Sequence, residues 1–180
     1  MPAADPRAFG PLPRPYVIYP DKRLSQVAVP VAAVNDEVRA LWDEMLDAMY
    51  AMPGVGLAAP QLGVAQRLVV VDAGADRTPL RMANPKILEW SLETEPGQEG
   101  SPNLPGVWAD VVRPREVTVE WLDEAGERRE QHLTGLWARS LQHQVDHLEG
   151  RLFIDRLGPV KRRMLLQKHA KRQRAAKRSS

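Results

Sequence analysis

The order in which helical and extended patterns follow one another is the feature that most limits the fold of this chain. A helical pattern begins after Asn35, which is placed to cap a helix, and it ends at Pro53-Gly54. Segments typical of β-strands then follow one another, at residues 67–72, 82–90, 116–122 and 128–133. A second helical pattern covers residues 136–150. Because the strands are consecutive instead of alternating with helices, we predict an α+β fold with antiparallel sheet.

The composition fits one globular domain. The chain has 180 residues, of which 43% are hydrophobic and 27% charged, and it contains no cysteine, so it can form no disulfide and offers no thiolate ligand. Its first residues lack the basic start and apolar run of a signal peptide, and no apolar run approaches the ~18 residues of a transmembrane helix. We therefore expect a soluble, cytoplasmic protein without a membrane partner. It is divided into a flexible arm (1–15), one domain (16–157) and a basic helical tail (158–180).

The tail is strongly basic. Nine residues between Lys161 and Arg178 are Lys or Arg and none is acidic, so removing these nine charges from the net charge of +2 leaves −7 for the rest of the chain. Two interpretations are open: a solvated helix that keeps the protein soluble, and a helix that contacts the phosphates of ribosomal RNA. No aromatic residue lies among the cations, so base stacking is not indicated, and no DNA partner is expected.

The sequence His143-Gln144-Val145-Asp146-His147 has the spacing of a metal site. Residues i and i+4 share one face of a helix, so both imidazoles can bind one divalent cation. Ordinary surface or core histidines also occur at this spacing. Asp146 is open to two interpretations as well, either a carboxylate that orients an imidazole or a solvated surface charge.

Two further segments are rich in small residues. Residues 54–61 (GVGLAAPQ) suit either tight backbone packing or a loop that brings N–H groups and one amide side chain to a ligand. Residues 98–106 carry two prolines and two glycines, a composition that predicts a loop and nothing more specific.

Together the three segments resemble the peptide deformylase family. GVGLAAPQ is followed by EG-x-x-x-x-PG and then by QH-x-x-DHLEG, and the similarity runs from about Tyr16 to Leu157. The resemblance implies an α+β fold in which a helix carrying HxxxH lies buried between antiparallel sheets, with an N-terminal helix and a basic C-terminal helix. It implies hydrolysis of the formyl group from the N-terminal Met of nascent bacterial proteins. The family uses Fe²⁺ or another divalent ion held by one Cys and two His, and a Glu between the two His as the base.

The resemblance also assigns roles to individual residues. His143 and His147 match the two imidazole ligands, and Gln61 matches the amide that receives the oxyanion. Gly56 and Gly100 are expected to lie against the substrate. Three further matches are given structural roles: Glu99, Arg113 and Asp146.

Three positions depart from the family pattern. Ser101 stands in the place of the metal-ligating Cys, and a hydroxyl does not supply a thiolate at neutral pH. Pro102 stands where a backbone N–H would receive the oxyanion, and Pro has none. Gln144 replaces the general base, and an amide cannot accept and return a proton.

These departures predict that the fold is retained while deformylase activity is lost or strongly reduced, as in a pseudoenzyme. His143 and His147 would then hold Fe²⁺, Zn²⁺ or Ni²⁺ weakly, or no metal at all. The alternative is an active metal-dependent deformylase with a rearranged site, in which Ser101 or a water is the third ligand and Glu99 or Asp146 the substitute base. A ligand set without sulfur would favour an ion such as Zn²⁺. The nascent peptide and the ribosome are the partners expected.

Overall fold

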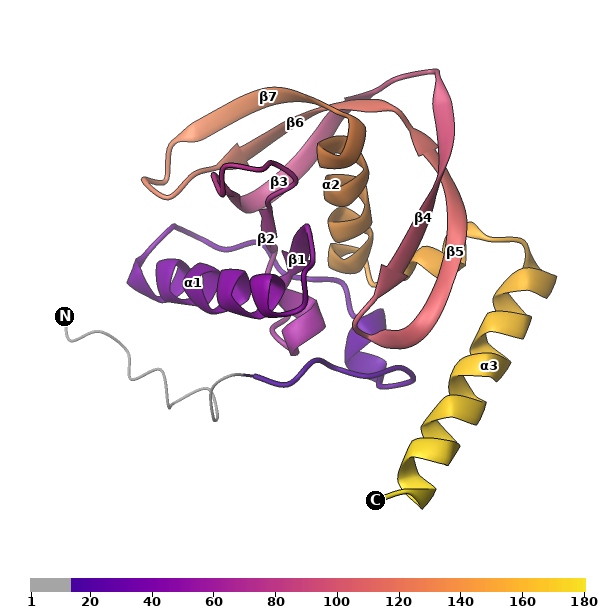
Figure 1. Cartoon of the computed structure of the whole chain (residues 1–180). Coiled ribbons are helices and arrows are strands. Elements are labelled where there is room, and N and C mark those ends of the chain that lie inside the picture. Colours follow the sequence, from indigo (N-terminus) through magenta and orange to yellow (C-terminus); the bar gives the residue numbers. More distant parts are fainter. Residues whose placement is uncertain (1–13) are drawn as a thin grey trace.

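A computed structural model describes residues 14–180, and almost all of the predicted N-terminal arm lies outside this range. The elements in chain order are η2 (Lys22–Ser25), α1 (Asp36–Ala51), β1 (Gly56–Ala58), η3 (Ala59–Leu62), β2 (Leu68–Val71), β3 (Leu80–Trp90), β4 (Thr94–Ser101), β5 (Leu104–Pro114), β6 (Glu116–Leu122), β7 (Arg128–Thr134), α2 (Gly135–Leu148), η4 (Phe153–Arg156) and α3 (Pro159–Arg178). Helix α2 stands between a large sheet and a separate hairpin, and α3 lies beside that hairpin (Figure 1). The predicted α+β architecture is confirmed.

The large sheet is antiparallel, with strand order β1-β2-β3-β6-β7. Strand β2, which lies between β1 and β3, is buried on both faces: alternate residues point to opposite sides of a strand, and all four of its residues are buried. Val69 and Val71 pack in the core with α2, whereas Leu68 and Val70 pack in the core with α1. The sheet therefore holds α1 and α2 on opposite faces.

Helix α1 begins where the sequence predicts. The Asn35 side chain accepts a hydrogen bond from the Val38 N–H and so caps the first turn. The residues buried by this helix recur at helical spacing: Val38, Trp42, Met45, Leu46 and Met49. Burial of this stripe against the sheet fixes the helix, and the chain then enters β1 through Pro53-Gly54.

The prediction of a loop at residues 98–106 was wrong. Strands β4 and β5 form a two-stranded antiparallel hairpin there, and Pro102 and Asn103 are the two residues between the paired Ser101 and Leu104. Proline is favoured at the first central position of a tight turn because its φ is already fixed there. Pro102 therefore has a structural function in this turn, although it cannot supply the backbone N–H expected at this position.

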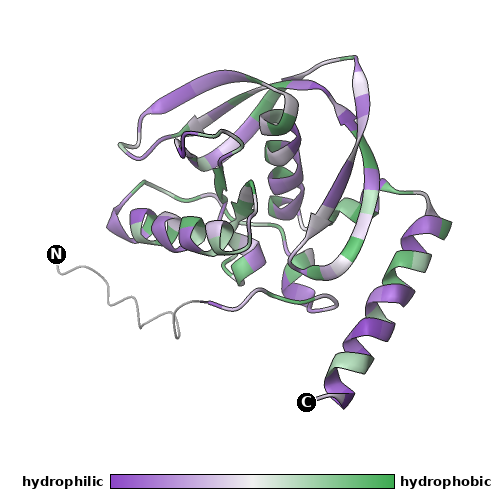
Figure 2. Ribbon diagram, in the orientation of Figure 1, coloured by the Kyte–Doolittle hydropathy of each residue, from purple (hydrophilic) through white to green (hydrophobic). Residues whose placement is uncertain are grey.

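The basic tail forms α3, which is predominantly hydrophilic (Figure 2). His169 is its only buried residue, and His169 Nε2 lies 3.0 Å from the carbonyl oxygen of Tyr19. Leu165 and Leu166 pack against the core formed by β5 and η4. This contact attaches α3 to the outer side of the hairpin, where Arg172 of α3 lies close to Gly106 of β5.

Candidate active site

Helix α2 brings His143 and His147 together in the protein interior. The two Nε2 atoms are 3.2 Å apart, and the exposed fractions of the two residues are 8% and 1%. The His143 ring stacks on Phe153 of η4, with ring centroids 6.1 Å apart. Burial, with a smaller contribution from His143, lowers the pKa of His147 well below its ordinary value, so this imidazole is neutral at pH 7.

Glu99 on β4 sets the tautomer of His143. Its Oε1 lies 2.7 Å from His143 Nδ1, and because a carboxylate can only accept, Nδ1 carries the proton. In the neutral ring the Nε2 lone pair then faces His147. Glu99 also accepts two hydrogen bonds from Arg113, of 2.6 and 2.8 Å, and one of 2.8 Å from Arg139. Burial acts to raise the pKa of Glu99, but the hydrogen bonds from Arg113 and His143 outweigh it and lower the pKa to about 2.

Asp146 differs from both interpretations given to it by the sequence. It is buried, so it is no solvated charge, and its hydrogen bonds go to Arg113 and Arg156 instead of to an imidazole. Glu99 makes the contact with histidine that Asp146 was thought to make. Neither carboxylate is placed to act as the substitute base, since both are held by arginines and the pKa of Glu99 is depressed.

Gln61 and Ser101 meet across a small hydrogen-bond network. Gln61, at the end of the GVGLAAPQ segment, accepts a hydrogen bond from the Ala58 N–H through Oε1. Its Nε2 donates to Asn103 Oδ1 at 2.7 Å and lies 3.4 Å from Ser101 Oγ. Ser101 Oγ in turn donates to Asn103 Oδ1 at 2.9 Å. All three side chains are buried.

A cavity of about 730 Å³ opens beside these groups. Its lining includes five of the polar residues described above or singled out by the sequence: Gln61, Glu99, Ser101, His143 and Gln144. The remaining lining is largely apolar, and the exposed ends of Ile18, Met52, Trp108 and Leu136 surround it. The cavity therefore joins an apolar binding space to the groups that the sequence singles out.

Gly56 and Gly100 both line this cavity, and neither position has room for a side chain. A Cβ at Gly56 would lie 2.3 Å from Ser140 Oγ and 2.7 Å from Gln144 Nε2. A Cβ at Gly100 would lie 2.4 Å from the Trp108 ring. The two glycines thus let Gln144 and Trp108 approach the backbone at the wall of the cavity.

Three features of the site were missed by the sequence interpretation. Asn103 binds the Ser101 side chain two residues away and the Gln61 side chain across 42 residues, Arg139 binds Glu99 across 40 residues, and Trp108 covers Gly100. Arg139 lies four residues before His143, so their shared face of α2 was a usable signal. Asn103 stood in a segment that composition marked only as loop, and nothing in the sequence distinguished it.

The residues present fit a divalent metal ion. The two imidazoles bring their Nε2 atoms together, and because His143 carries its proton on Nδ1, the Nε2 proton of the contact belongs to His147. His147 Nδ1 is a buried nitrogen without a hydrogen-bond partner in the described chain, so this ring can move its proton to Nδ1 and free Nε2 for an ion. Within residues 14–180 no cluster of three His, Cys, Asp or Glu side chains is gathered to bind a metal. A third protein ligand would therefore be a neutral oxygen, for which Ser101 is the candidate.

An α+β fold whose HxxxH helix pairs two imidazoles in the interior, one of them lining a largely apolar cavity, is typical of a metal-dependent hydrolase. A family model described as polypeptide deformylase matches residues 13–163, and the chain belongs to this family. The peptide deformylase of Methylocella silvestris is 46% identical over 164 residues, which cover 88% of this chain and 84% of that protein. The peptide deformylase of Phenylobacterium zucineum is 43% identical over 166 residues, covering 91% and 98%.

Solved structures agree with this assignment. The crystal structure of peptide deformylase from Ehrlichia chaffeensis in complex with actinonin superposes with a TM-score of 0.84 at 36% identity, covering 89% of this chain and 97% of that one. The predicted fold, with a central HxxxH helix, an N-terminal helix and a basic C-terminal helix, is thereby confirmed. No helix within residues 14–180 is long and apolar enough to cross a membrane.

The prediction that deformylase activity is lost or strongly reduced was wrong. Relatives that match this chain over most of their length, at 43–46% identity, are peptide deformylases, and nothing in these comparisons indicates a pseudoenzyme. The prediction rested on the thiolate, the backbone N–H and the base that Ser101, Pro102 and Gln144 do not supply. In the structure each of the three residues has a local role. Ser101 Oγ is part of the hydrogen-bond network with Gln61 and Asn103, Pro102 forms the turn between β4 and β5, and Gln144 places an amide in the cavity lining.

Proposed function

We propose that this chain is a metal-dependent peptide deformylase that hydrolyses the N-formyl group from the N-terminal Met of nascent peptides, using a site rearranged around Ser101 and Gln144. The observation that carries the proposal is the pair of buried Nε2 atoms of His143 and His147, 3.2 Å apart, with His143 lining a largely apolar cavity. Membership of the deformylase family supports the reaction type.

The metal would be held by His143 and His147, with Ser101 or a water completing the set. Zn²⁺, Ni²⁺ and Fe²⁺ all accept imidazole ligands, and the absence of sulfur disfavours softer ions. When bound, a divalent ion lowers the pKa of water in its coordination shell and polarises a carbonyl oxygen. The chain's own task is then to position the substrate and the water, more than to supply a strong base.

The substrate would enter the cavity with its Met side chain among the apolar residues of the lining. Gln61 would donate a hydrogen bond from Nε2 to the formyl oxygen as negative charge develops there. Its amide is held in that direction because Oε1 accepts from the Ala58 N–H, which can only donate. The donor is therefore oriented before substrate binds.

Gln144 would position the attacking water. Its Oε1 is buried and has no hydrogen-bond partner in the structure, a costly condition for a buried carbonyl oxygen. A water or a substrate N–H in the cavity would supply the missing donor. Hydrolysis then adds water across the formyl C–N bond, so formate leaves and the liberated amine takes up a proton.

The direct test is release of formate from a formyl-Met peptide by the purified full-length chain, loaded in turn with Fe²⁺ under anaerobic conditions, Ni²⁺, Zn²⁺ and Co²⁺. We expect metal-dependent turnover that the double variant His143→Ala/His147→Ala lacks. The exposed His132 on β7 gives a matched control, and His132→Ala should keep full turnover. Formate release no faster than that of the double variant, with every metal, would refute the proposal.

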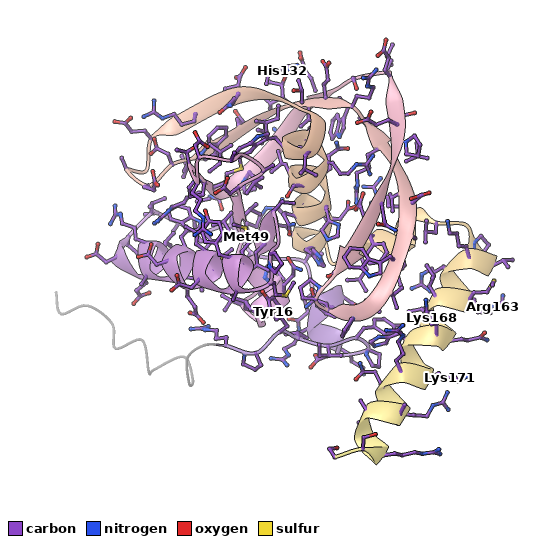
Figure 3. The ribbon with its side chains drawn as sticks, viewed as in Figure 1. Tyr16, Met49, His132, Arg163, Lys168 and Lys171 are labelled. Atoms are coloured by element: carbon purple, nitrogen blue, oxygen red, sulfur yellow. The ribbon has the colours of Figure 1, made fainter. Side chains whose placement is uncertain are left out.

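We also propose that α3 binds the ribosome through RNA phosphates, as a cytoplasmic deformylase acting on emerging chains. Arg163, Lys168 and Lys171 are exposed on α3, and Figure 3 shows Arg163 and Lys171 standing out from the helix. Replacing all three by Gln should weaken co-sedimentation with ribosomes at low salt, because each phosphate contact releases counterions. The matched control replaces Arg115, Arg128 and Arg129, which lie on other exposed surfaces, and unchanged binding of the α3 variant would refute this role.

A further inference from the structure

We propose that Asn103 is the positioning residue of this site: from behind the cavity lining it fixes the Gln61 amide and turns the Ser101 hydroxyl so that Ser101 offers its oxygen to the metal. The inference rests on the proposed function for its consequence in catalysis. Asn103 is fully buried and absent from the cavity lining, while the two side chains that it holds, Gln61 and Ser101, are both part of that lining.

The orientation of the Asn103 amide follows from two backbone carbonyls. Asn103 Nδ2 donates to the Val17 oxygen at 2.6 Å and to the Gln61 main-chain oxygen at 3.2 Å. Both oxygens can only accept, so a rotated amide would set acceptor against acceptor at each of them. Asn103 Oδ1 must therefore point to the other side, toward the Gln61 and Ser101 side chains.

The orientation of Gln61 is fixed in turn. Because Asn103 Oδ1 can only accept, Gln61 must present Nε2 to it, across 2.7 Å. Gln61 Oε1 then accepts from the Ala58 N–H at 2.9 Å, which is the arrangement that this donor also requires. The Gln61 amide is thus oriented at both ends: an acceptor, Asn103 Oδ1, faces its Nε2, and a donor, the Ala58 N–H, faces its Oε1. One Nε2 hydrogen is used by Asn103, and the second is left on the side of Ser101 and the cavity.

The same reasoning sets the hydroxyl proton of Ser101. Ser101 Oγ lies 2.9 Å from Asn103 Oδ1, and of these two atoms only the hydroxyl can donate. The Ser101 proton consequently points at Asn103, and the oxygen lone pairs are turned elsewhere. Two N–H groups approach them only at long range, the Asn103 main-chain N–H at 3.3 Å and Gln61 Nε2 at 3.4 Å. Such long contacts are readily given up to a cation.

Asn103 therefore does for Ser101 what an outer hydrogen bond commonly does for a metal ligand, which is to fix its direction and its protonation. A hydroxyl and two imidazoles carry no negative charge as ligands, so the ion would keep its full 2+ charge. If Asn103 only stabilised the turn, replacing it would change metal binding no more than it changes folding. A positioning role and a purely structural role can therefore be separated by measuring both metal affinity and stability.

The test is a double-mutant cycle on Co²⁺ affinity, read from the visible absorption of the bound ion, with no substrate present. Wild type, Asn103→Leu, Ser101→Ala and the double variant are titrated with Co²⁺. Each single change should weaken binding by about 10–100-fold, the loss typical for outer partners of metal ligands. The double variant should be no weaker than Ser101→Ala, because Asn103 acts through Ser101.

A matched control separates positioning from folding. The half-buried Asn84 holds Val31 by two hydrogen bonds of 2.9 Å, as Asn103 holds its neighbours, but it contacts none of the site residues. Asn84→Ala should lower the midpoint of thermal unfolding and leave Co²⁺ affinity unchanged. Should Asn103→Leu fail to fold, Asn103→Ser, which creates no bulk, replaces it in the same cycle.

Unchanged Co²⁺ affinity in the Asn103 variants would overturn the inference. It would also be overturned if Asn103→Leu weakened Co²⁺ binding as much in the Ser101→Ala variant as in wild type. A wild-type chain that binds no Co²⁺ would overturn it as well. Formate release is measured separately. If the cycle shows the expected coupling while no formate appears, the proposed function fails and the role of Asn103 stands. If formate appears but the cycle shows no coupling, the proposed function stands and the role of Asn103 fails.

Discussion

Glu99 Oε1 lies 2.7 Å from His143 Nδ1, and this contact decides which nitrogen of His143 is available to a metal ion. The carboxylate is itself held by Arg113 and Arg139, so a buried cluster of charges stands behind the imidazole. In such a cluster the removal of one partner leaves the others uncompensated. The metal ligand is therefore tied to the stability of the whole site.

This contact predicts that the protein loses stability in acid. The pKa of Glu99 is about 2 in the folded chain against 4.5 for an unperturbed group, so its ionisation stabilises the fold fully above pH 4.5. The stabilisation is lost as the pH falls from 4.5 toward 2, and it amounts to about 3 kcal/mol. Urea unfolding followed by tryptophan fluorescence at a series of pH values measures it.

The variant Glu99→Gln should remove that pH dependence and lower the free energy of unfolding at pH 7 by about 3–5 kcal/mol, because Arg113 is left without its partner. Glu116, which contacts His132 on the surface, provides the control, and Glu116→Gln should change stability by less than about 1 kcal/mol. A Glu99→Gln variant as acid-sensitive as wild type would contradict the assignment.

Metal binding should raise the melting temperature through His147. An ion that binds only the folded chain stabilises it by about 2.7 kcal/mol at a concentration of 100 Kd. We expect Zn²⁺ or Ni²⁺ to raise the midpoint for wild type and for His132→Ala, and to leave His147→Ala unchanged. Removal of the ion with a chelator should reverse the shift. An equal shift in His147→Ala would place the metal elsewhere.

The sequence predicted those parts of the fold whose signals are local. The stripe of α1 and the alternation in residues 116–122 both reflect neighbours within a few residues, and they led to the correct elements. The hairpin of β4 and β5 was missed because its stabilising contacts come from afar. Arg139 on α2 donates hydrogen bonds to the carbonyl oxygens of Glu95 and Val111, across 44 and 28 residues. A segment of proline and glycine gives no sign of such a partner.

The site shows the same division between local and distant information. The spacing of His143 and His147 predicted two imidazoles on one helix face, and the structure places their Nε2 atoms together. The resemblance to the family located Gln61 and Ser101. The interpretation of Asp146 failed because adjacency in sequence does not place a helical residue on the same face, and Asp146 turns toward Arg113 and Arg156 instead.

Gln144 should matter for turnover and little for substrate binding. In Gln144→Leu the cavity keeps its size but loses the acceptor that positions water, so kcat should fall by about 10–100-fold with KM nearly unchanged. In Gln144→Glu a titratable acceptor is restored, and the pH profile of kcat should gain an ascending limb at the pKa of the new carboxyl. Steady-state kinetics of formate release measures both, and a Gln144→Leu enzyme with wild-type kcat would exclude this role.

Trp108 should determine affinity for the part of the peptide that follows Met. Its ring lies against Gly100, its exposed fraction is 60%, and it lines the cavity together with Leu136, which is 50% exposed. An apolar side chain seated between the two would bury surface on both. Loss of about 40–55 Å² of that contact corresponds to roughly 1–1.4 kcal/mol, or about 5–10-fold in binding.

Trp108→Ala should therefore raise KM about 5–10-fold for formyl-Met peptides with Leu or Phe as the second residue, and less for those with Ser, while kcat stays within about twofold. Trp90, which is 56% exposed and lies outside the cavity, gives the matched control, and Trp90→Ala should leave KM unchanged. Because we expect Trp108 to contact the peptide and none of the reacting groups, a fall in kcat at constant KM would show that it supports the hairpin instead. An equal rise in KM for the Leu and Ser peptides would show that it does not contact the second residue.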